Sequence, residues 1–184
     1  MNLTKLFEIQ KELDRKIIEK KGLEGRDLLP ERILALQVEL GECANEWRGF
    51  KFWSEDREPR TKIAKPFAND MRGDGYIYQN PLLEEYVDCL HFILSIGLEV
   101  GVTANKFISF KLDSITDQFI ELNYQIYRVK QLSEWSKQRA RLDWVMLFDL
   151  FMGLGEMLGF SPGEIEDAYL AKNEVNHERQ VNGY

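Results

Sequence analysis

The spacing of apolar residues constrains the fold of this 184-residue chain more than any other feature. Apolar side chains recur every three to four residues along almost the whole sequence, which is the period of an amphipathic α-helix. We find no runs in which β-branched residues alternate with polar ones, as half-buried strands require. The sequence therefore predicts an all-α helical bundle, and its length fits a single domain spanning residues 1–184.

The apolar pattern predicts five to six helices. They fall at about residues 3–18, 30–47, 81–101, 103–132, 137–158 and 162–181. Pro81 suits the first turn of the third helix, and Thr103 is a candidate cap of the fourth. The best-marked start is that of the last helix, where Ser161, Pro162 and Glu164 offer an N-cap, a first-turn proline and a capping box.

A long segment between the second and third helices, residues 48–80, does not follow the helical pattern. It contains glycines, prolines and basic residues mixed with acidic ones. A loop of this length within a compact domain is usually functional or mobile. A lid over a site and a solvated insertion remain equally good interpretations of its central part.

Composition favours an ordinary soluble globular protein, with 44% hydrophobic and 30% charged residues. The net charge of -7 argues against nucleic-acid binding, yet divalent cations can bridge acidic side chains to phosphate oxygens. The N-terminus has no apolar signal core, and residues 144–160 are too short and too charged to span a bilayer, so we expect no membrane association. We expect the two cysteines, Cys43 and Cys89, to be buried thiols in a reducing cytoplasm.

Two acidic pairs stand out on the second and third helices. Glu39 and Glu42 are three residues apart, as are Glu85 and Asp88, so each pair shares a helix face. Carboxylates that project from facing helices into a bundle repel one another unless a cation compensates them. Oxygen ligands alone suit Mg²⁺ or Mn²⁺. Such pairs are also common on exposed faces, and spacing alone favours neither interpretation.

The last helix carries a polar stripe. Tyr169, Lys172, Asn176 and Arg179 follow a spacing that keeps them on one face. Lysine and arginine suit phosphate oxygens, and asparagine suits the edge of a base or sugar. Taken alone, however, the stripe fits better with an exposed helix end whose basic residues complement the helix dipole.

Taken together, these segments resemble the dimeric dUTPases of the all-α NTP pyrophosphatase superfamily. The two acidic pairs resemble the metal signature of the superfamily. Four further stretches resemble motifs of the dimeric dUTPases: Phe50-Lys51-Phe52-Trp53, Asp88-x-x-His91-Phe92-x-x-Ser95, Lys172-Asn173-x-x-Asn176-x-x-Arg179-Gln180-x-x-Gly183-Tyr184, and Gln10 with Asp14. Asp14 stands where asparagine is more usual, and residues 54–80 have no counterpart in the pattern.

The resemblance implies hydrolysis of dUTP to dUMP and pyrophosphate. Glu39, Glu42, Glu85 and Asp88 would hold two or three Mg²⁺ ions, with Mn²⁺ as a substitute, and the ions would activate a water. Glu42 would also orient or deprotonate that water. The remaining site residues would bind the nucleotide, namely Gln10, Asp14, Lys51, Trp53, His91, Lys172, Asn176, Arg179 and Tyr184. The resemblance further implies a cytoplasmic homodimer.

Within this assignment, Lys172 and Arg179 would neutralise the phosphate chain. Gln10, Asp14, Trp53, His91 and Asn176 would form the nucleoside pocket. The large apolar residues of the fourth and fifth helices are candidates for either core or dimer interface: Phe119, Ile126, Tyr127, Trp144, Phe148 and Phe151.

Two alternatives stay open at this point. The first is a related pyrophosphatase that acts on another nucleotide, such as dCTP or a modified nucleotide, because only the base pocket would differ. The second is a non-catalytic helical interaction protein. The presence of all four acidic residues argues against the second alternative.

Overall fold

The computed structural model describes residues 1–66, 76–102 and 107–182. Within these ranges the chain forms six α-helices and one pair of strands. Their bounds are α1 (Leu3–Lys21), α2 (Leu29–Trp47), β1 (Ile63–Pro66), β2 (Tyr76–Gln79), α3 (Pro81–Val100), α4 (Ile115–Ser133), α5 (Lys137–Met157) and α6 (Pro162–Asn182). The predicted all-α bundle is confirmed.

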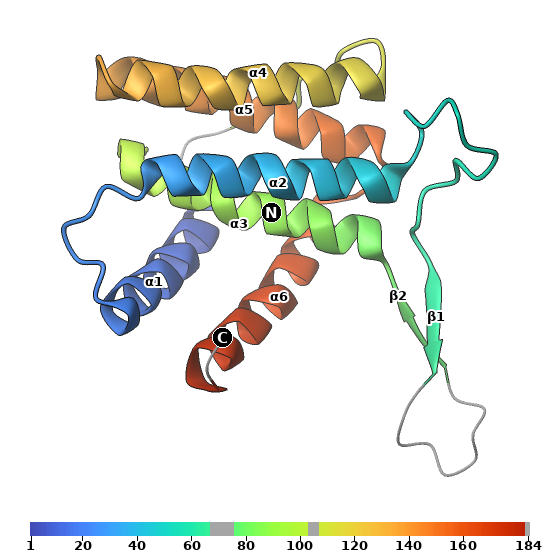
Figure 1. The fold of residues 1–184 in the computed structure, drawn as a ribbon, viewed down its shortest axis with the longest axis horizontal. Coiled ribbons are helices and arrows are strands. Elements are labelled where there is room, and N and C mark those ends of the chain that lie inside the picture. The colour runs from blue at the N-terminus through green and yellow to red at the C-terminus, as the bar shows by residue number, and fades with distance from the viewer. Residues whose placement is uncertain (67–75, 103–106, 183–184) are drawn as a thin grey trace.

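The helices are arranged around α3. In Figure 1, α4 and α5 lie along one side of the α2–α3 pair, whereas α1 and α6 are inclined to that pair and lie on its other side. Helix α3 packs against α1, α2, α5 and α6, and the chain turns by 106° between α5 and α6. The polar face of α3 is therefore flanked by α1, α2 and α6.

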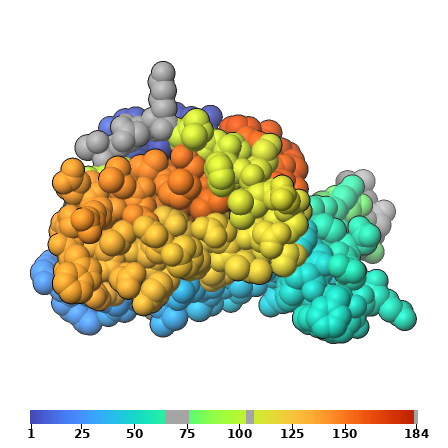
Figure 2. All heavy atoms as spheres, turned by 90° about the horizontal axis from the view of Figure 1, so that it is seen from above, coloured from blue at the N-terminus to red at the C-terminus, as the bar shows by residue number. Residues whose placement is uncertain are grey.

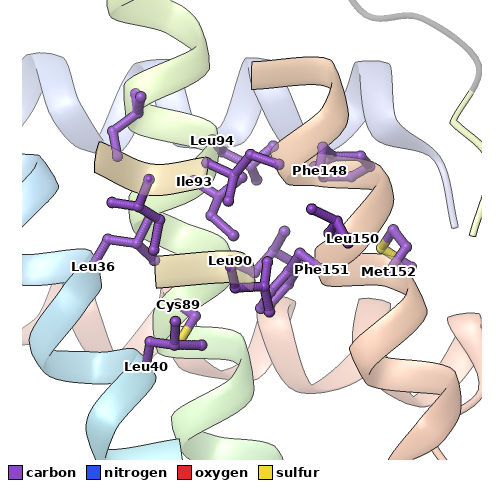
Figure 3. Close-up of a cluster of buried hydrophobic side chains, with 14 of the residues drawn as sticks. Leu36, Leu40, Cys89, Leu90, Ile93, Leu94, Phe148, Leu150, Phe151 and Met152 are labelled. Atoms are coloured by element: carbon purple, nitrogen blue, oxygen red, sulfur yellow. The ribbon is translucent and has the colours of Figure 1, made fainter. Parts of the chain in front are cut away.

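One part of the hydrophobic core lies between α2, α3 and α5. Figure 3 shows its side chains: Leu36, Leu40, Cys89, Leu90, Ile93, Leu94, Phe148, Leu150, Phe151 and Met152. Each of these is almost completely buried, and burying one large apolar side chain contributes about 1.5–3 kcal/mol. Cys43 and Cys89 are free and fully buried, as expected.

One glycine permits a close aromatic contact in this core. Tyr86 of α3 stacks on Phe151 of α5 with ring centroids 4.2 Å apart, and its hydroxyl donates to the Phe151 carbonyl oxygen at 2.9 Å. A Cβ on Gly155 would lie 2.5 Å from the Tyr86 hydroxyl. Only glycine leaves room for this buried hydroxyl, whose hydrogen bond joins α3 to α5.

The predicted capping box at the start of α6 is confirmed. The Ser161 hydroxyl accepts a hydrogen bond from the Glu164 amide at 3.3 Å, and the Glu164 carboxylate accepts one from the Ser161 amide at 2.9 Å. Asn80 caps α3 in a similar way, accepting from the Leu83 amide at 3.1 Å, with Pro81 in the first turn. These caps fix the start of α3 and α6, two of the helices that carry predicted site residues.

The fourth helix begins later than the apolar spacing indicates. Helix α4 starts at Ile115 and is capped by Ser114, whereas Thr103 lies outside the described residues. Residues 107–112 are not helical, because the Ile108 amide donates to the Asp149 carboxylate at 2.9 Å and binds this segment to α5. The apolar residues here resemble a helical pattern because the segment packs one side against α5.

A short β-hairpin within residues 48–80 was not predicted. Strands β1 and β2 pair antiparallel with Ile63 opposite Gln79, and the hairpin extends beyond the ends of α2 and α3 (Figure 1). Each strand has four residues, too few to give a clear alternating pattern. The Lys62 ammonium lies 4.3 Å from the centre of the exposed Tyr78 ring, an additional cross-strand contact.

Across the described part of the chain, no single helix has the length and apolar character needed to cross a membrane. The bent pair formed by α5 and α6 satisfies that criterion by length and composition only.

Candidate active site

Three of the four predicted metal ligands converge where α2 lies against α3. Glu39 comes from α2, and Glu85 and Asp88 come from α3. One carboxylate oxygen from each lies within 4.8 Å of the others, and all three side chains are partly buried. We call these three residues the carboxylate cluster.

The electrostatics of the carboxylate cluster favour a bound cation. Burial, and then the neighbouring charges of Asp88, Glu42 and Glu39, raise the pKa of Glu85 to about 7. Burial and the charge of Asp88 also raise the pKa of Glu39. Like charges held at this distance in a partly desolvated site disfavour full ionisation unless a positive charge compensates them.

The fourth predicted ligand, Glu42, lies at the edge of this group. Its side chain is exposed, and it does not belong to the set of three whose oxygens lie within 4.8 Å. Its charge nevertheless contributes to the raised pKa of both Glu39 and Glu85, so it lies near the cluster. Glu42 is thus close enough to act on the cluster while remaining accessible to water.

Helix α6 supplies a cation to the carboxylate cluster. The Lys172 ammonium donates a hydrogen bond to Asp88 Oδ2, and both side chains are mostly buried. The positive charge of Lys172 also opposes the upward pKa shifts of Glu39 and Glu85. Lys172 therefore brings the polar stripe of α6 into contact with the site. At this residue the stripe is not simply the solvent-exposed end of a helix.

The donor set of the carboxylate cluster fits a hard divalent cation. Its three candidate ligands are all carboxylate oxygens, which Mg²⁺ and Mn²⁺ prefer over sulfur or imidazole. The Lys172 ammonium on Asp88 shows that a positive charge is stabilised at this position. The residues present therefore match the expected metal chemistry.

A cavity of about 470 Å³ opens beside the carboxylate cluster, which is large enough for most of a nucleotide. Its polar lining comes from four helices: Gln10 and Asp14 on α1, Arg32 and Glu39 on α2, Asp88, His91 and Ser95 on α3, and Asn176 and Arg179 on α6. Its apolar lining includes Leu13, Ile17, Leu28 and Phe92. We call this space the polar cavity; it links the cluster to an apolar surface suited to a flat ring.

A hydrogen-bonded network forms one wall of the polar cavity. The Gln10 amide nitrogen donates to Asp14 Oδ1 at 2.8 Å and to the Ser95 hydroxyl oxygen at 3.0 Å. The Ser95 hydroxyl donates to the same Asp14 oxygen at 2.8 Å. The Gln10 carbonyl oxygen accepts from the Tyr169 hydroxyl at 2.8 Å and lies 2.8 Å from His91 Nδ1. The network connects α1, α3 and α6.

Arg32 anchors this network to α2. Its guanidinium lies 3.4 Å from Asp14 Oδ2 and 2.6 Å from a Glu99 oxygen. Burial raises the pKa of Asp14, and the charge of Arg32 opposes that rise. The pairing holds an acidic side chain in a position where an isolated carboxylate would be costly.

His91 is the most deeply buried titratable group on the cavity wall. Only 5% of its surface is exposed, and its ring stacks on Tyr169 with centroids 4.1 Å apart. Burial lowers the pKa of His91 to about 3, with a smaller contribution from Lys172, so the ring is neutral. Among the described residues, none forms a hydrogen bond with His91 Nε2.

The structure does not bring every predicted nucleotide-binding residue to the polar cavity. Of the described residues that line it, none is Lys51 or Trp53, and Trp53 is 65% exposed. Arg48, with a φ of 64°, ends α2 and redirects the chain, and Trp47 stacks between Phe50 and Phe119 of α4. This segment therefore projects from the bundle, as the protruding part of Figure 2 shows. Tyr184 lies outside the described residues.

The sequence-based assignment missed Arg32, Ser95 and Tyr169 as parts of the site. Arg32 is seven residues before Glu39, two helical turns away, and this spacing could have placed it on the same face. Ser95 lies within a stretch that resembles the family and Tyr169 belongs to the polar stripe, but neither carries a charge that would mark it as functional. Their importance appears only when three helices are brought together.

Taken together, the helical bundle, the carboxylate cluster and the adjoining polar cavity define an all-α nucleotide pyrophosphatase. A family model described as dUTPase matches residues 2–68 and 75–184, and the chain therefore belongs to the all-α dUTPase family. It catalyses the hydrolysis of dUTP to dUMP and pyrophosphate. A comparison with curated proteins found no match.

Proposed function

We propose that the carboxylate cluster and Glu42 bind the Mg²⁺ ions of the dUTPase reaction, two or three in number, and that the polar cavity holds the nucleotide. The observation that supports this most strongly is the convergence of Glu39, Glu85 and Asp88, whose oxygens lie within 4.8 Å of one another. Mn²⁺ can replace Mg²⁺ because both prefer carboxylate oxygens.

When bound, Mg²⁺ would supply charge neutralisation at the phosphates and would make a water more acidic. Glu42 would act as the general base for the attacking water. Its exposed carboxylate lies near the cluster without being confined in it, which leaves an oxygen available as a general base.

Lys172 and Arg179 stabilise negative charge on the phosphate chain. The Lys172 ammonium already lies at the carboxylate cluster, and Arg179 lines the polar cavity two helical turns further along α6. Positive side chains held in place before the reaction stabilise charge without reorganisation of solvent.

The nucleoside occupies the cavity between α1, α3 and α6. Gln10, Asp14, His91 and Asn176 provide polar contacts there, and Phe92 adds an aromatic surface. Lys51, Trp53 and Tyr184 are retained as substrate-binding residues on the family resemblance alone.

We further propose that the enzyme is a homodimer. Of the large apolar residues considered as core or interface, Phe119, Ile126, Trp144, Phe148 and Phe151 are core, and Tyr127 is 56% exposed. Figure 2 shows the surface formed by α4 and α5. Ile120 and Tyr127 are exposed on α4, and the exposed Tyr124 of α4 lines a surface hollow with Leu142 and Met146 of α5. An apolar surface of this kind supports a contact between subunits.

The proposal also covers the domain organisation and the cellular compartment. One core cluster contains side chains from all six helices, which supports a single domain over residues 1–184. The free thiols of Cys43 and Cys89 support a reducing compartment, the cytoplasm.

Direct measurement of metal binding tests the proposed metal site. Calorimetric titration with Mg²⁺ should show saturable binding to the wild-type protein and much weaker binding to Glu85→Gln. Glu84→Gln is the matched control, because Glu84 is the exposed neighbour on the same helix. Equal binding by the wild type and Glu85→Gln would contradict the proposed metal site.

A further inference from the structure

We propose that the β-hairpin formed by β1 and β2 is a binding site for single-stranded nucleic acid. Tyr76 and Tyr78 stack on bases, and basic residues of the same hairpin contact phosphates. We call residues 60–66 and 76–80 the hairpin arm; it belongs to the segment between α2 and α3. The proposed function assigns no role to the hairpin arm.

The hairpin arm is fixed at its base to the helical bundle. The Arg60 amide donates to the Glu46 carbonyl oxygen at 3.0 Å, and the Leu82 amide donates to the Arg60 carbonyl oxygen at 3.2 Å. The Arg60 guanidinium also lies 3.2 Å from the Glu46 carboxylate. Beyond this point the strands extend away from the ends of α2 and α3 (Figure 1). The arm therefore presents its side chains to solvent from a defined position.

One face of the hairpin arm carries two exposed tyrosines. Tyr76 and Tyr78 are two residues apart on β2, so they share a face of the hairpin. The residues opposite them on β1 are Pro66 and Ala64, both small compared with an aromatic ring. The tyrosines are accordingly 60% and 61% exposed. Large aromatic side chains gathered on an exposed surface in this way are typical of a binding site.

The spacing of the two tyrosines suits flat rings. Side chains two residues apart on a strand are separated by roughly 7 Å. An aromatic ring that lies between two others needs about 3.5 Å on each side. Tyr76 and Tyr78 can therefore hold one base between them or stack on successive bases. Stacking of this kind tolerates any base sequence, because every base has an aromatic face.

The charge of the hairpin arm favours a polyanion as the partner. The arm contains Arg60, Lys62 and Lys65 and no acidic residue, whereas the whole chain has a net charge of -7. The charge that argues against general nucleic-acid binding therefore belongs to the rest of the chain. The Lys62 ammonium lies 4.3 Å from the centre of the Tyr78 ring, so a positive charge accompanies an exposed ring. Proteins bind single strands through this combination of cations and aromatic rings, whereas a duplex hides the faces of its bases.

Binding at the hairpin arm leaves the active site open. The described residues that line the polar cavity come from α1, α2, α3 and α6 and from the segment between α1 and α2, and none belongs to the arm. The carboxylate cluster likewise comes from α2 and α3. Hydrolysis of dUTP should therefore continue while a strand is bound, and the two activities can be measured separately.

Fluorescence anisotropy with a labelled oligothymidylate tests the binding. The buffer contains EDTA, so that no metal ion bridges the carboxylate cluster to phosphates. The wild-type protein should bind the single strand, and the logarithm of the binding constant should fall with that of the salt concentration with a slope of about -2, as expected for two or three phosphate contacts. The corresponding duplex should bind roughly tenfold more weakly. Absence of single-strand binding, or equal binding of the duplex, would overturn the proposal.

An oligouridylate measured in parallel distinguishes DNA from RNA as the source of the strand. Binding of either oligonucleotide supports the proposal, and the tighter of the two identifies the preferred sugar. Thymidine monophosphate should compete only weakly, because it has a single phosphate group. Competition by the mononucleotide as effective as that by the oligonucleotide would overturn the assignment to a strand.

Substitutions in the hairpin arm identify the surface. Combining Tyr76→Ala with Tyr78→Ala should weaken strand binding at least ~10-fold, whereas Tyr78→Phe, which keeps the ring, should preserve it. Lys62→Met should reduce the salt slope by about 0.7. Trp135→Ala is the matched control, because Trp135 is 80% exposed and belongs to the turn between α4 and α5, at the opposite end of the bundle from the arm (Figure 1). Wild-type affinity in the double tyrosine variant would overturn the proposal.

The double tyrosine variant should retain wild-type helical circular dichroism and dUTP turnover, because neither tyrosine belongs to the hydrophobic core or lines the polar cavity. Failure of the proposed function would appear as absent dUTP turnover in the wild type, which strand binding in EDTA does not report. Light scattering of the same variant tests a different occupant. A variant that binds the strand normally but dissociates into monomers would show that a second copy of the chain covers the tyrosines, and would overturn the proposal.

Discussion

The Lys172 ammonium of α6 forms an ion pair with Asp88 of α3, at the carboxylate cluster. This ion pair places a protein cation where the proposed mechanism requires a metal cation. It also connects the last helix to the central helix, so the basic face of α6 and the acidic face of α3 form one site.

Replacing Lys172 with methionine should make the protein depend more on Mg²⁺ for stability. Without the ammonium, the carboxylate cluster loses its compensating charge and the metal-free protein is destabilised. The difference in Tm between Mg²⁺ and EDTA should therefore be larger than in the wild type. Lys130→Met, which removes an ion pair to Glu134 at the C-terminal end of α4, should leave that difference unchanged. An unaltered difference in Lys172→Met would contradict the role of this ion pair.

The stability of the metal-free protein should decrease as pH rises from about 4.5 to about 7. The pKa of Glu85 is raised to about 7 in the folded protein, so the folded state binds more protons than the unfolded state in this range. The stabilisation is complete below the unfolded pKa and is lost as pH rises through the folded pKa. Urea unfolding in EDTA at several pH values measures the effect.

Glu85→Gln provides the comparison for this pH dependence. The variant should show a flatter dependence across the same range, because the titrating group is gone, while Glu84→Gln should retain the wild-type slope. An identical slope in Glu85→Gln and the wild type would show that another group is responsible.

Much of this site is predictable from local spacing, because helix geometry is regular. Residues three apart share a face, so each acidic pair was expected to point one way, and the capping box of Ser161 marked the start of α6. The spacing of residues along the sequence does not predict how far one helix is rotated about its axis relative to its neighbour. The rotation of α2 against α3 brings Glu39 to Glu85 and leaves Glu42 exposed.

Contacts between distant segments account for the features that were not predicted. Arg32 of α2 forms an ion pair with Asp14 of α1. The sequence around either residue does not indicate that the two are partners. Helix α4 starts at Ile115 because the Phe110 amide bonds to the Asp149 carbonyl oxygen on α5 at 3.0 Å, which competes with helix formation. The four-residue strands of the hairpin depend on pairing with each other.

Glu42→Gln should reduce kcat by at least ~100-fold, since both metal binding and proton transfer suffer. Because the side chain is exposed, Tm should change little. Steady-state rates of pyrophosphate release measure the effect, with Glu84→Gln as the matched control. Near-normal turnover in Glu42→Gln would remove Glu42 from the mechanism.

The protein should be a dimer in solution at micromolar concentration. Light scattering measures its mass, and Tyr127→Glu, which places a charge on the exposed face of α4, should shift the population towards monomer. A wild-type protein that is monomeric under these conditions would contradict the proposed homodimer.

The central claim is that Mg²⁺ at the carboxylate cluster supports hydrolysis of dUTP in preference to other nucleotides. Pyrophosphate release should be measured for dUTP, dCTP and dTTP, each with Mg²⁺ and with EDTA. We expect rapid release from dUTP with Mg²⁺, much slower release from dCTP and dTTP, and none in EDTA. Equal rates for dUTP and dCTP, or dUTP turnover that persists in EDTA, would contradict the account.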